Sequence, residues 1–326
     1  MKKVVSILLA LTMLFALGVT ALALEPGENP GLVLGGSAIP PTNDPDCAAY
    51  VVTEPEATDE VTVTFIMEAP NEYWDVEGAF YFEAEVSLTA DEAQTFNLVE
   101  LLEKVEEDYD EFSFDIQSYT VDGTTLYDLV GVTHDDTTFE PDSFDLWGWE
   151  FRINDLFPVV PRTAPDGYEG TYLNQTYISD GDVIHFFLDY PATVYGFNYA
   201  TSYIRIVPTN AEVGSVSVQL QGQKVDYENV TYTDADGNTR TTLQLQVNNY
   251  EDFATSTVVY LYNEAGVLVT SGATDANGQV TLSNSGIAAG NYVLRTDSVL
   301  QNDDPLGEWD ECLFTQTSGY KTITIS

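Results

Sequence analysis

Two histidines, His134 and His185, would have to supply any imidazole that acts as a general base or binds zinc in this 326-residue chain. His134 precedes two aspartates, but a zinc site needs three or four well-placed ligands, so a structural histidine is favoured. The chain has no Gly-x-Ser-x-Gly motif and no glycine-rich phosphate loop. With 53 acidic residues, any chosen pair of carboxylates is uninformative as a catalytic pair. The sequence therefore predicts a protein that is not an enzyme.

The segment WGWEFRIND, residues 147–155, alternates large apolar side chains with polar ones, which is typical of a β-strand. The rings could fill a core or form a platform for a ligand. Core packing is favoured for Phe151 and Ile153, because a strand that faces a helix needs apolar residues on one face. We expect Trp147 and Trp149, near the start of the strand, to contribute to a ligand-binding rim.

A second candidate binding segment is VPRTAPDGYEGTYLNQT, residues 160–176, which is long for a hairpin loop. It carries Tyr168, Tyr172 and Asn174, and long ordered loops with aromatic residues often bind ligands. A variable surface loop is the alternative. All three residues are ligand-binding candidates.

Oxygen-rich segments raise the question of calcium. Asp234, Asp236 and Asn238 have the alternating spacing of a calcium loop, but the terminal bidentate glutamate of an EF-hand is absent. A hairpin turn explains the same residues and is favoured, so they are weak metal candidates and no metal site is predicted. The acidic run at 103–111 could attract calcium or a cationic partner, although a solvated surface is the favoured interpretation.

Cys47 and Cys312 are the two cysteines of the chain. In an exported protein two cysteines commonly pair, and this disulfide would join the N-terminal segment to the second half of the chain. Closing so long a loop would contribute about 4 to 5 kcal/mol in the chain-entropy model. Two free thiols are the alternative.

Residues 1–23 contain two lysines, an apolar run and a small-residue pattern ending at Ala23, which is typical of a secretory signal peptide. An uncleaved membrane anchor is disfavoured, because the apolar run is short for a span of about 20 residues. No later segment is long and apolar enough to cross a bilayer. We expect a secreted protein, extracellular or associated with the cell surface, with no membrane span in the mature chain.

The formal net charge is −43, from 53 acidic and 10 basic residues. Such a charge repels nucleic acids and anionic lipid surfaces, so neither is expected as a partner. A small molecule, a surface protein or a glycan remain as partner classes.

Strands dominate the elements that would position these residues. Five further segments rich in β-formers are predicted as strands: 61–69, 80–89, 112–123, 182–191 and 203–208. One helix is predicted in TFNLVELLEKVEEDY, where Thr95 can cap the N-terminus and an apolar stripe follows. The stripe consists of Leu98, Leu101, Leu102 and Val105.

From Val213 onward, short alternating strands are separated by compact turns, and there is almost no helix signal. The turns DADGN, NEAG and DANG place Asp, Asn or Gly where the backbone needs tight or left-handed dihedral angles. We therefore predict a mostly β protein, with an α+β domain over 60–207 and an antiparallel β-sandwich over 208–326. Residues 24–59, rich in Pro, Gly and acid, are predicted to be a flexible linker.

Four motifs follow in order through the first half: Leu101 with Leu102, Gly123, the Trp-rich strand ending at Asn154, and GDVI at 181–184. Over about residues 60–207 this order resembles the domain family related to the C-terminal domain of transcobalamin. The resemblance implies a β-grasp-like fold in which one helix packs on a small sheet. It also implies a corrinoid as a candidate ligand, in contact with rings near Trp147, Trp149 and Tyr172.

In the second half, TDANGQ at 274–279 and GNY at 290–292 resemble transthyretin-like or carboxypeptidase-regulatory-like sandwiches, including collagen-adhesin B-type repeats. The resemblance covers about residues 213–326. Some adhesin repeats carry a Lys–Asn isopeptide bond, but the final strand YKTITIS lacks the asparagine, so no such bond is expected.

These features favour binding outside the cell. We expect a secreted, non-enzymatic binding protein of a bacterial cell surface, with its ligand held by the first domain. The alternative is a structural or adhesive surface component that binds a protein or a glycan.

Overall fold

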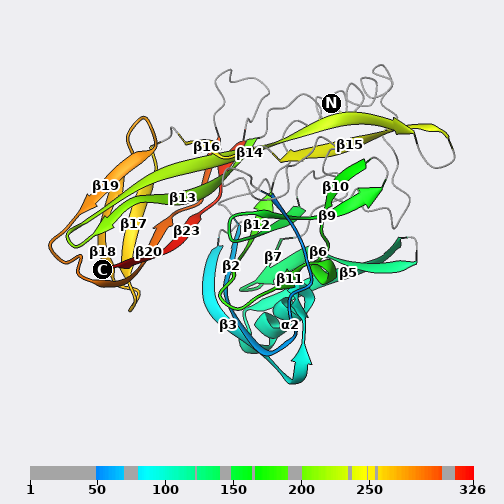
Figure 1. The fold of residues 1–326 in the computed structure, drawn as a ribbon, viewed down its shortest axis with the longest axis horizontal. Helices are drawn as coiled ribbons and strands as arrows, with labels where there is room; N and C mark the ends of the chain where they lie inside the picture. Colours follow the sequence, from blue (N-terminus) through cyan, green and yellow to red (C-terminus); the bar gives the residue numbers. More distant parts are fainter. Residues whose placement is uncertain are drawn as a thin grey trace, which may run out of the picture.

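The computed structural model describes residues 49–69, 80–121, 123–139, 148–163, 166–189, 200–233, 237–247, 249–253, 256–302 and 313–326. Most of these residues lie in β-strands, and one α-helix is present among them, so the predicted fold class is confirmed. They form two packed units, which we call the first module (49–189) and the second module (200–326) (Figure 1).

The elements of the first module are β1 (Ala49–Val51), β2 (Thr58–Ala69), β3 (Phe80–Gln94), β4 (Phe96–Asn97), α2 (Leu98–Asp108), β5 (Phe112–Val121), β6 (Thr124–His134), β7 (Thr137–Phe139), β8 (Gly148–Ile153), β9 (Phe157–Thr163), β10 (Asp166–Gly170), η1 (Leu173–Gln175), β11 (Tyr177–Ile178) and β12 (Val183–Asp189). Its main sheet has the order β3-β2-β12-β8. The central pair, β2 and β12, is parallel, whereas β3 and β8 pair antiparallel at the edges. The main sheet is therefore mixed, and the helix follows its first hairpin.

The helix α2 begins two residues later than the sequence suggested. Asn97 caps it, because its Oδ1 accepts hydrogen bonds from the backbone N–H groups of Val99 and Glu100, while the Glu100 carboxylate accepts from the Asn97 N–H. The prediction of Thr95 as the cap is wrong. Phe96 and Asn97 form β4, which pairs with β11, so the backbone is extended until Leu98.

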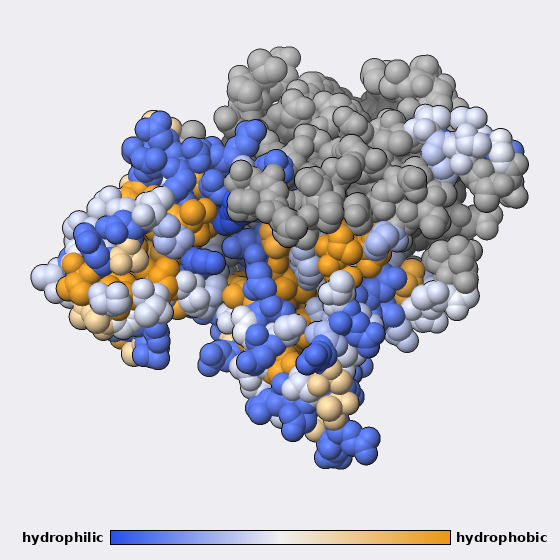
Figure 2. All heavy atoms as spheres, viewed as in Figure 1, coloured by the Kyte–Doolittle hydropathy of each residue, from blue (hydrophilic) through white to orange (hydrophobic). Residues whose placement is uncertain are grey.

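The apolar stripe of α2 is confirmed: its four members, Leu98, Leu101, Leu102 and Val105, are buried. They share one hydrophobic core with the inward residues of the main sheet and with the three-stranded sheet β5-β6-β7. The acidic run at 103–111 lies on the other side of the helix, where most of its carboxylates are exposed. Figure 2 shows mainly hydrophilic residues over this end of the first module.

The segment predicted as a flexible linker is partly structured. Ala49–Val51 forms β1, which pairs in parallel with β9, and Ala49 is buried. The segment 160–176, predicted as a long loop, instead contains the end of β9, the strand β10 and the short helix η1. The pairing of β9 with both β1 and β10 explains why these segments are structured, because backbone N–H and C=O groups of each strand then find hydrogen-bond partners.

The elements of the second module are β13 (Ala200–Glu212), β14 (Ser215–Thr233), β15 (Thr239–Val247), β16 (Glu251–Asp252), β17 (Val258–Asn263), β18 (Leu268–Ala273), β19 (Gln279–Ser283), β20 (Gly290–Thr296), β21 (Val299–Asn302), β22 (Leu313–Gln316) and β23 (Gly319–Ile325). One sheet has the order β15-β14-β13-β22-β21, with β16 and β19 also paired to β14. The other has the order β18-β17-β20-β23. The two sheets enclose a second hydrophobic core, as expected for a sandwich.

The boundary between the modules falls before Ala200 rather than after Val207. The strand β13 pairs with β14 and β22, and its Ile204 and Ile206 lie in the second core. The far half of β14 leaves the sandwich and forms a two-stranded hairpin with β15 that extends past the first module (Figure 1). None of the helical residues that the structure describes forms a segment long and apolar enough to cross a membrane.

Candidate functional site

One face of the main sheet of the first module lies on the first core, and the second module covers part of the other face. In β8, Trp149, Phe151 and Ile153 point into the first core, because alternate residues of a strand point to the same face. Glu150 and Arg152 therefore point to the opposite face, which would ordinarily meet solvent. Arg152 is nevertheless only 4% exposed, because the second module covers it.

The Arg152 guanidinium is held almost entirely by the second module. Its Nη1 donates to the Tyr250 hydroxyl at 2.5 Å, and its Nη2 donates to Gln223 Oε1 at 2.6 Å. Its Cζ lies 3.6 Å from the ring centroid of Tyr203 and 4.4 Å from that of Phe157. Because the cation is buried, these aromatic faces and acceptors must replace the water that it loses.

A two-residue turn extends this contact. Asn154 and Asp155 both have positive φ angles, of 52° and 65°, in the turn that joins β8 to β9. The Tyr250 hydroxyl donates to the backbone oxygen of Asp155 at 2.9 Å. Burial raises the pKa of Tyr250 to about 12, although Arg152 opposes the shift. Burial also raises the pKa of the Asp155 carboxyl, against the attraction of Lys321 and Arg152.

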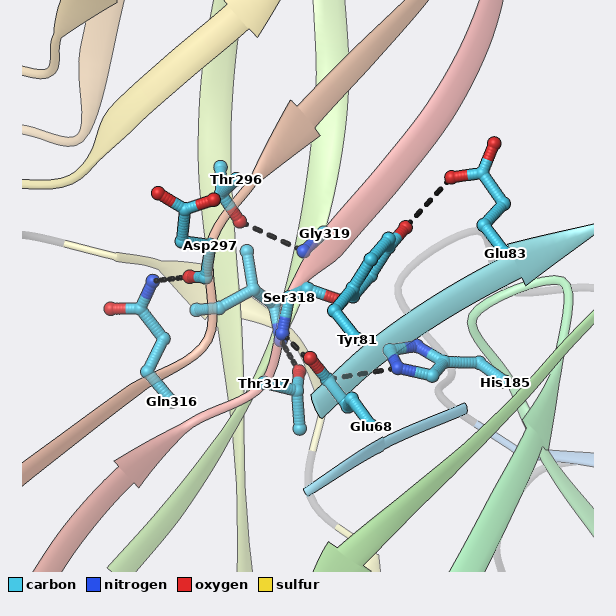
Figure 3. Close-up of polar contacts among 11 residues, drawn as sticks. Glu68, Tyr81, Glu83, His185, Thr296, Asp297, Gln316, Thr317, Ser318 and Gly319 are labelled. Atoms are coloured by element: carbon cyan, nitrogen blue, oxygen red, sulfur yellow. Dashed lines mark hydrogen bonds and ion pairs between the residues drawn. The ribbon is translucent and has the colours of Figure 1, made fainter. Parts of the chain in front are cut away.

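A buried glutamate makes a second contact between the modules. Glu68 and His185 lie on the neighbouring strands β2 and β12, and Glu68 Oε1 is 2.9 Å from His185 Nε2. The same oxygen accepts a hydrogen bond from the backbone N–H of Ser318, in the second module, at 2.8 Å (Figure 3). Glu68 is 1% exposed, and its Oε2 is buried without a hydrogen bond among the described residues. The carboxylate thus orders the short segment between β22 and β23.

An ion pair makes a third contact between the modules, at the edge of the main sheet. Arg295 of β20 pairs with Glu83 of β3, and the same carboxylate accepts a hydrogen bond from the Tyr81 hydroxyl at 2.8 Å. The rings of Tyr262 and Tyr320 lie 5.1 and 6.0 Å from Arg295 Cζ. We call these three contacts, centred on Arg152, Glu68 and Glu83, the junction.

Among the residues that the structure describes, neither histidine has a nucleophile beside it. His185 contacts Glu68, but the Ser318 hydroxyl near that carboxylate makes no hydrogen bond, so these three residues do not form a triad. His134 stacks on the ring of Phe80 at 4.4 Å, with its Nδ1 3.9 Å from Asp135. Within the described part of the chain, no group of three or more acidic, histidine or cysteine side chains could hold a metal ion.

Two of the predicted ligand-binding residues are engaged within the fold. Trp149 is 6% exposed, and its indole N–H donates to the backbone oxygen of Phe139 at 3.2 Å. Asn174 Oδ1 accepts from the Tyr127 N–H at 3.1 Å, and its Nδ2 donates to the Thr125 oxygen at 3.0 Å. Both side chains thus support the first module.

The other three candidates are placed in part or not at all. Tyr172 is half-buried immediately before η1, and its backbone N–H donates to Gln175 Oε1 at 3.2 Å. Tyr168 lies in β10, opposite Pro161 of β9. Trp147 lies outside the described residues.

The weak metal candidates and the cysteines lie mostly outside the described residues. Asp234, Asp236, Cys47 and Cys312 are not among them, so the disulfide and the calcium loop stay predictions. Asn238 follows Gly237, whose φ is 81°, in the connection between β14 and β15. The antiparallel pairing of these strands is the hairpin expected from the DADGN sequence.

The junction residues were not singled out from the sequence as functional. Arg152 and Glu68 occupy the polar positions of alternating strands, which the pattern assigns to solvent. The signal that could have found Arg152 is its place directly after Phe151, as a cation in an apolar strand of a chain with 10 basic and 53 acidic residues.

A scan against models of known protein families gives no match for this chain. A search of curated proteins gives no match either.

Proposed function

We propose that the chain is a secreted, non-enzymatic binding protein of a bacterial cell surface that acts as a structural or adhesive component, with a protein or a glycan as its partner. The observation that carries the proposal is the junction. It commits the chemically versatile side chains on the outer face of the main sheet, Arg152, His185 and Glu68, to holding the second module.

The junction favours a rigid display role over catalysis. A catalytic base or acid must reach a substrate, whereas Glu68 is buried and His185 contacts it. An adhesive protein gains from modules that keep a fixed orientation, because its binding surface then stays directed away from its attachment point. The net charge of −43 supports solubility outside the cell and disfavours polyanionic partners.

Capture of a corrinoid by the first module stays a prediction. The polar atoms of Trp149 and Asn174 already make hydrogen bonds within the fold, so we assign no ligand contact to these side chains. An absorbance titration with cobalamin tests it directly. A spectral change with retained ligand would favour capture over adhesion.

The test of the proposal has two parts, both on the full chain expressed in a bacterial host. Mass spectrometry of the exported protein is expected to find an N-terminus after Ala23. The purified protein is then sedimented with isolated bacterial cell walls, either untreated, protease-treated or treated with periodate to oxidise glycans. Saturable binding that one treatment abolishes supports the proposal. Retention in the cytoplasm, or no binding to any preparation, overturns it.

A further inference from the structure

The outer face of the sheet β18-β17-β20-β23 has an unusual composition for this chain. In β17, Val259 and Leu261 point into the second core, so Val258, Tyr260 and Tyr262 point outward. The strand register places outward residues of all four strands side by side. Within these strands no outward position holds an aspartate or a glutamate, although the chain has 53 of them.

Tyrosine rings lie along this face, two of them side by side and a third on the other side of an arginine. The ring centroids of Tyr260 and Tyr262 are 6.3 Å apart, with an interplanar angle of 36°. Arg295 lies beyond them, with its Cζ 5.1 Å from the Tyr262 ring and 5.8 Å from the ring of Tyr81, which belongs to the first module. We call Tyr81, Tyr260 and Tyr262 the tyrosine strip. It crosses from one module to the other and is continuous with the junction.

The strip is accessible and bordered by exposed apolar residues. Tyr81 is 41% exposed, and the rings of Tyr260 and Tyr262 are half-buried. Val258 and Leu268 are 39% and 48% exposed on the same face. Large aromatic side chains that are partly exposed beside apolar neighbours mark binding surfaces more often than isolated apolar residues do. Apolar residues reach the surface over the second module in Figure 2.

The cation beside the strip, Arg295, is already paired with a carboxylate. Arg295 is neutralised by Glu83, and Asp297 accepts a hydrogen bond from the Tyr260 hydroxyl at 2.9 Å. A phosphate or carboxylate ligand would find no unpaired cation here and would meet the repulsion of the whole chain. The surface therefore matches an uncharged partner.

We propose that the tyrosine strip binds an extended neutral glycan, an inference that rests on the proposed surface function. A sugar ring presents an apolar C–H face, which stacks on a flat aromatic ring, and a rim of hydroxyl groups. The rings of the strip supply flat contact area, and their hydroxyls, with Ser271 of β18 and Thr322 of β23, supply hydrogen-bonding groups without charge. A sheet face without enclosing walls suits a chain that lies along it better than a small enclosed molecule.

Affinity electrophoresis tests this with four neutral polysaccharides as probes, laminarin, mannan, galactan and hydroxyethylcellulose, and with polygalacturonate as the anionic control. The full chain is expected to be retarded by at least one neutral probe and not by polygalacturonate. Tyr262→Ala should weaken that binding about tenfold, because it removes a stacking ring. Tyr262→Phe should stay within about threefold of the wild type, because it keeps the ring.

Two further variants keep the result interpretable. Leu268→Glu leaves both cores intact and adds a carboxylate beside the strip, so it should weaken binding without changing the melting temperature. Tyr119→Ala, on β5 of the first module, removes a partly exposed tyrosine away from the strip and should leave polysaccharide binding unchanged. Failure of all four neutral probes to retard the protein overturns the glycan proposal. If cell walls still bind the chain in that case, the proposed surface function stands and its partner is a protein.

Discussion

Replacing Arg152 with alanine should destabilise the protein and allow the two modules to unfold separately. The side chain donates two hydrogen bonds from a charged group, each worth about 1.5 to 3 kcal/mol, and contacts the rings of Tyr203 and Phe157 for about 2 kcal/mol. Part of this sum offsets the cost of burying the cation. Removing one partner from a buried ionic contact costs about 3 to 5 kcal/mol in other proteins, so about 4 kcal/mol is expected here.

The measurement is thermal unfolding of the full chain, followed by far-UV circular dichroism. A loss of about 4 kcal/mol should lower the melting temperature by about 8 °C and broaden or split the transition, because the modules then unfold separately. Arg152→Lys should recover part of the loss, since it keeps the charge but not the planar pair of donors.

The matched control is Lys104→Ala, which removes a surface cation that pairs with Glu107 and Asp108 on α2. Exposed ion pairs contribute little, so the midpoint should stay within error of the wild type. If Arg152→Ala shifts the midpoint no more than Lys104→Ala does, the junction is not a stabilising interface and the reasoning fails.

Three other predictions concern single groups. Asp155→Asn should raise the melting temperature at pH 7, because the raised carboxyl pKa means that stability falls as the pH rises from the unfolded pKa to the folded pKa, and the full loss persists above it; the gain should disappear at low pH, where the carboxyl is neutral in both states, and a lower melting temperature at pH 7 would contradict it. The neutral Tyr250 hydroxyl contributes stability that is complete below pH 10 and is lost toward pH 12, up to about 3 kcal/mol, so Tyr250→Phe should flatten the alkaline stability curve; an unchanged slope would refute this. Gly278→Ala should destabilise the protein by about 2 kcal/mol more than Gly266→Ala in denaturant titrations. Both glycines have positive φ angles, but the added Cβ would lie 2.2 Å from the Phe253 oxygen at position 278 and meets nothing at position 266, so equal losses would show that the clash is relieved.

Local patterns in the sequence predicted the elements well. The stripe of α2 is buried as expected, and so are Phe151 and Ile153, since each set repeats with the period of its element. Trp149, which was expected at a ligand-binding rim, is buried with them. The cap of α2 was predicted at Thr95, although Asn97 and Glu100 have the spacing of a capping box. The pairing of β4 with β11, which keeps Phe96 and Asn97 extended, joins residues about 80 positions apart and has no local signal.

The junction could not be predicted by the same means. A periodic pattern gives one buried face to a strand, but β8 is covered on both faces by different modules. The hydrogen bond from Ser318 to Glu68 joins residues 250 positions apart, and neither residue type predicts it. The tyrosine strip has the same origin, since Tyr81 and Tyr262 come together only through the docking of the two modules.

Residual dipolar couplings of backbone amides in the full chain test the fixed orientation of the two modules most directly. If the junction is rigid, one alignment tensor should fit the amide couplings of β2, β8 and β12 together with those of β13, β17 and β20. Two tensors of different magnitude would mean that the modules reorient independently, and would contradict the rigid junction on which the proposed surface role depends.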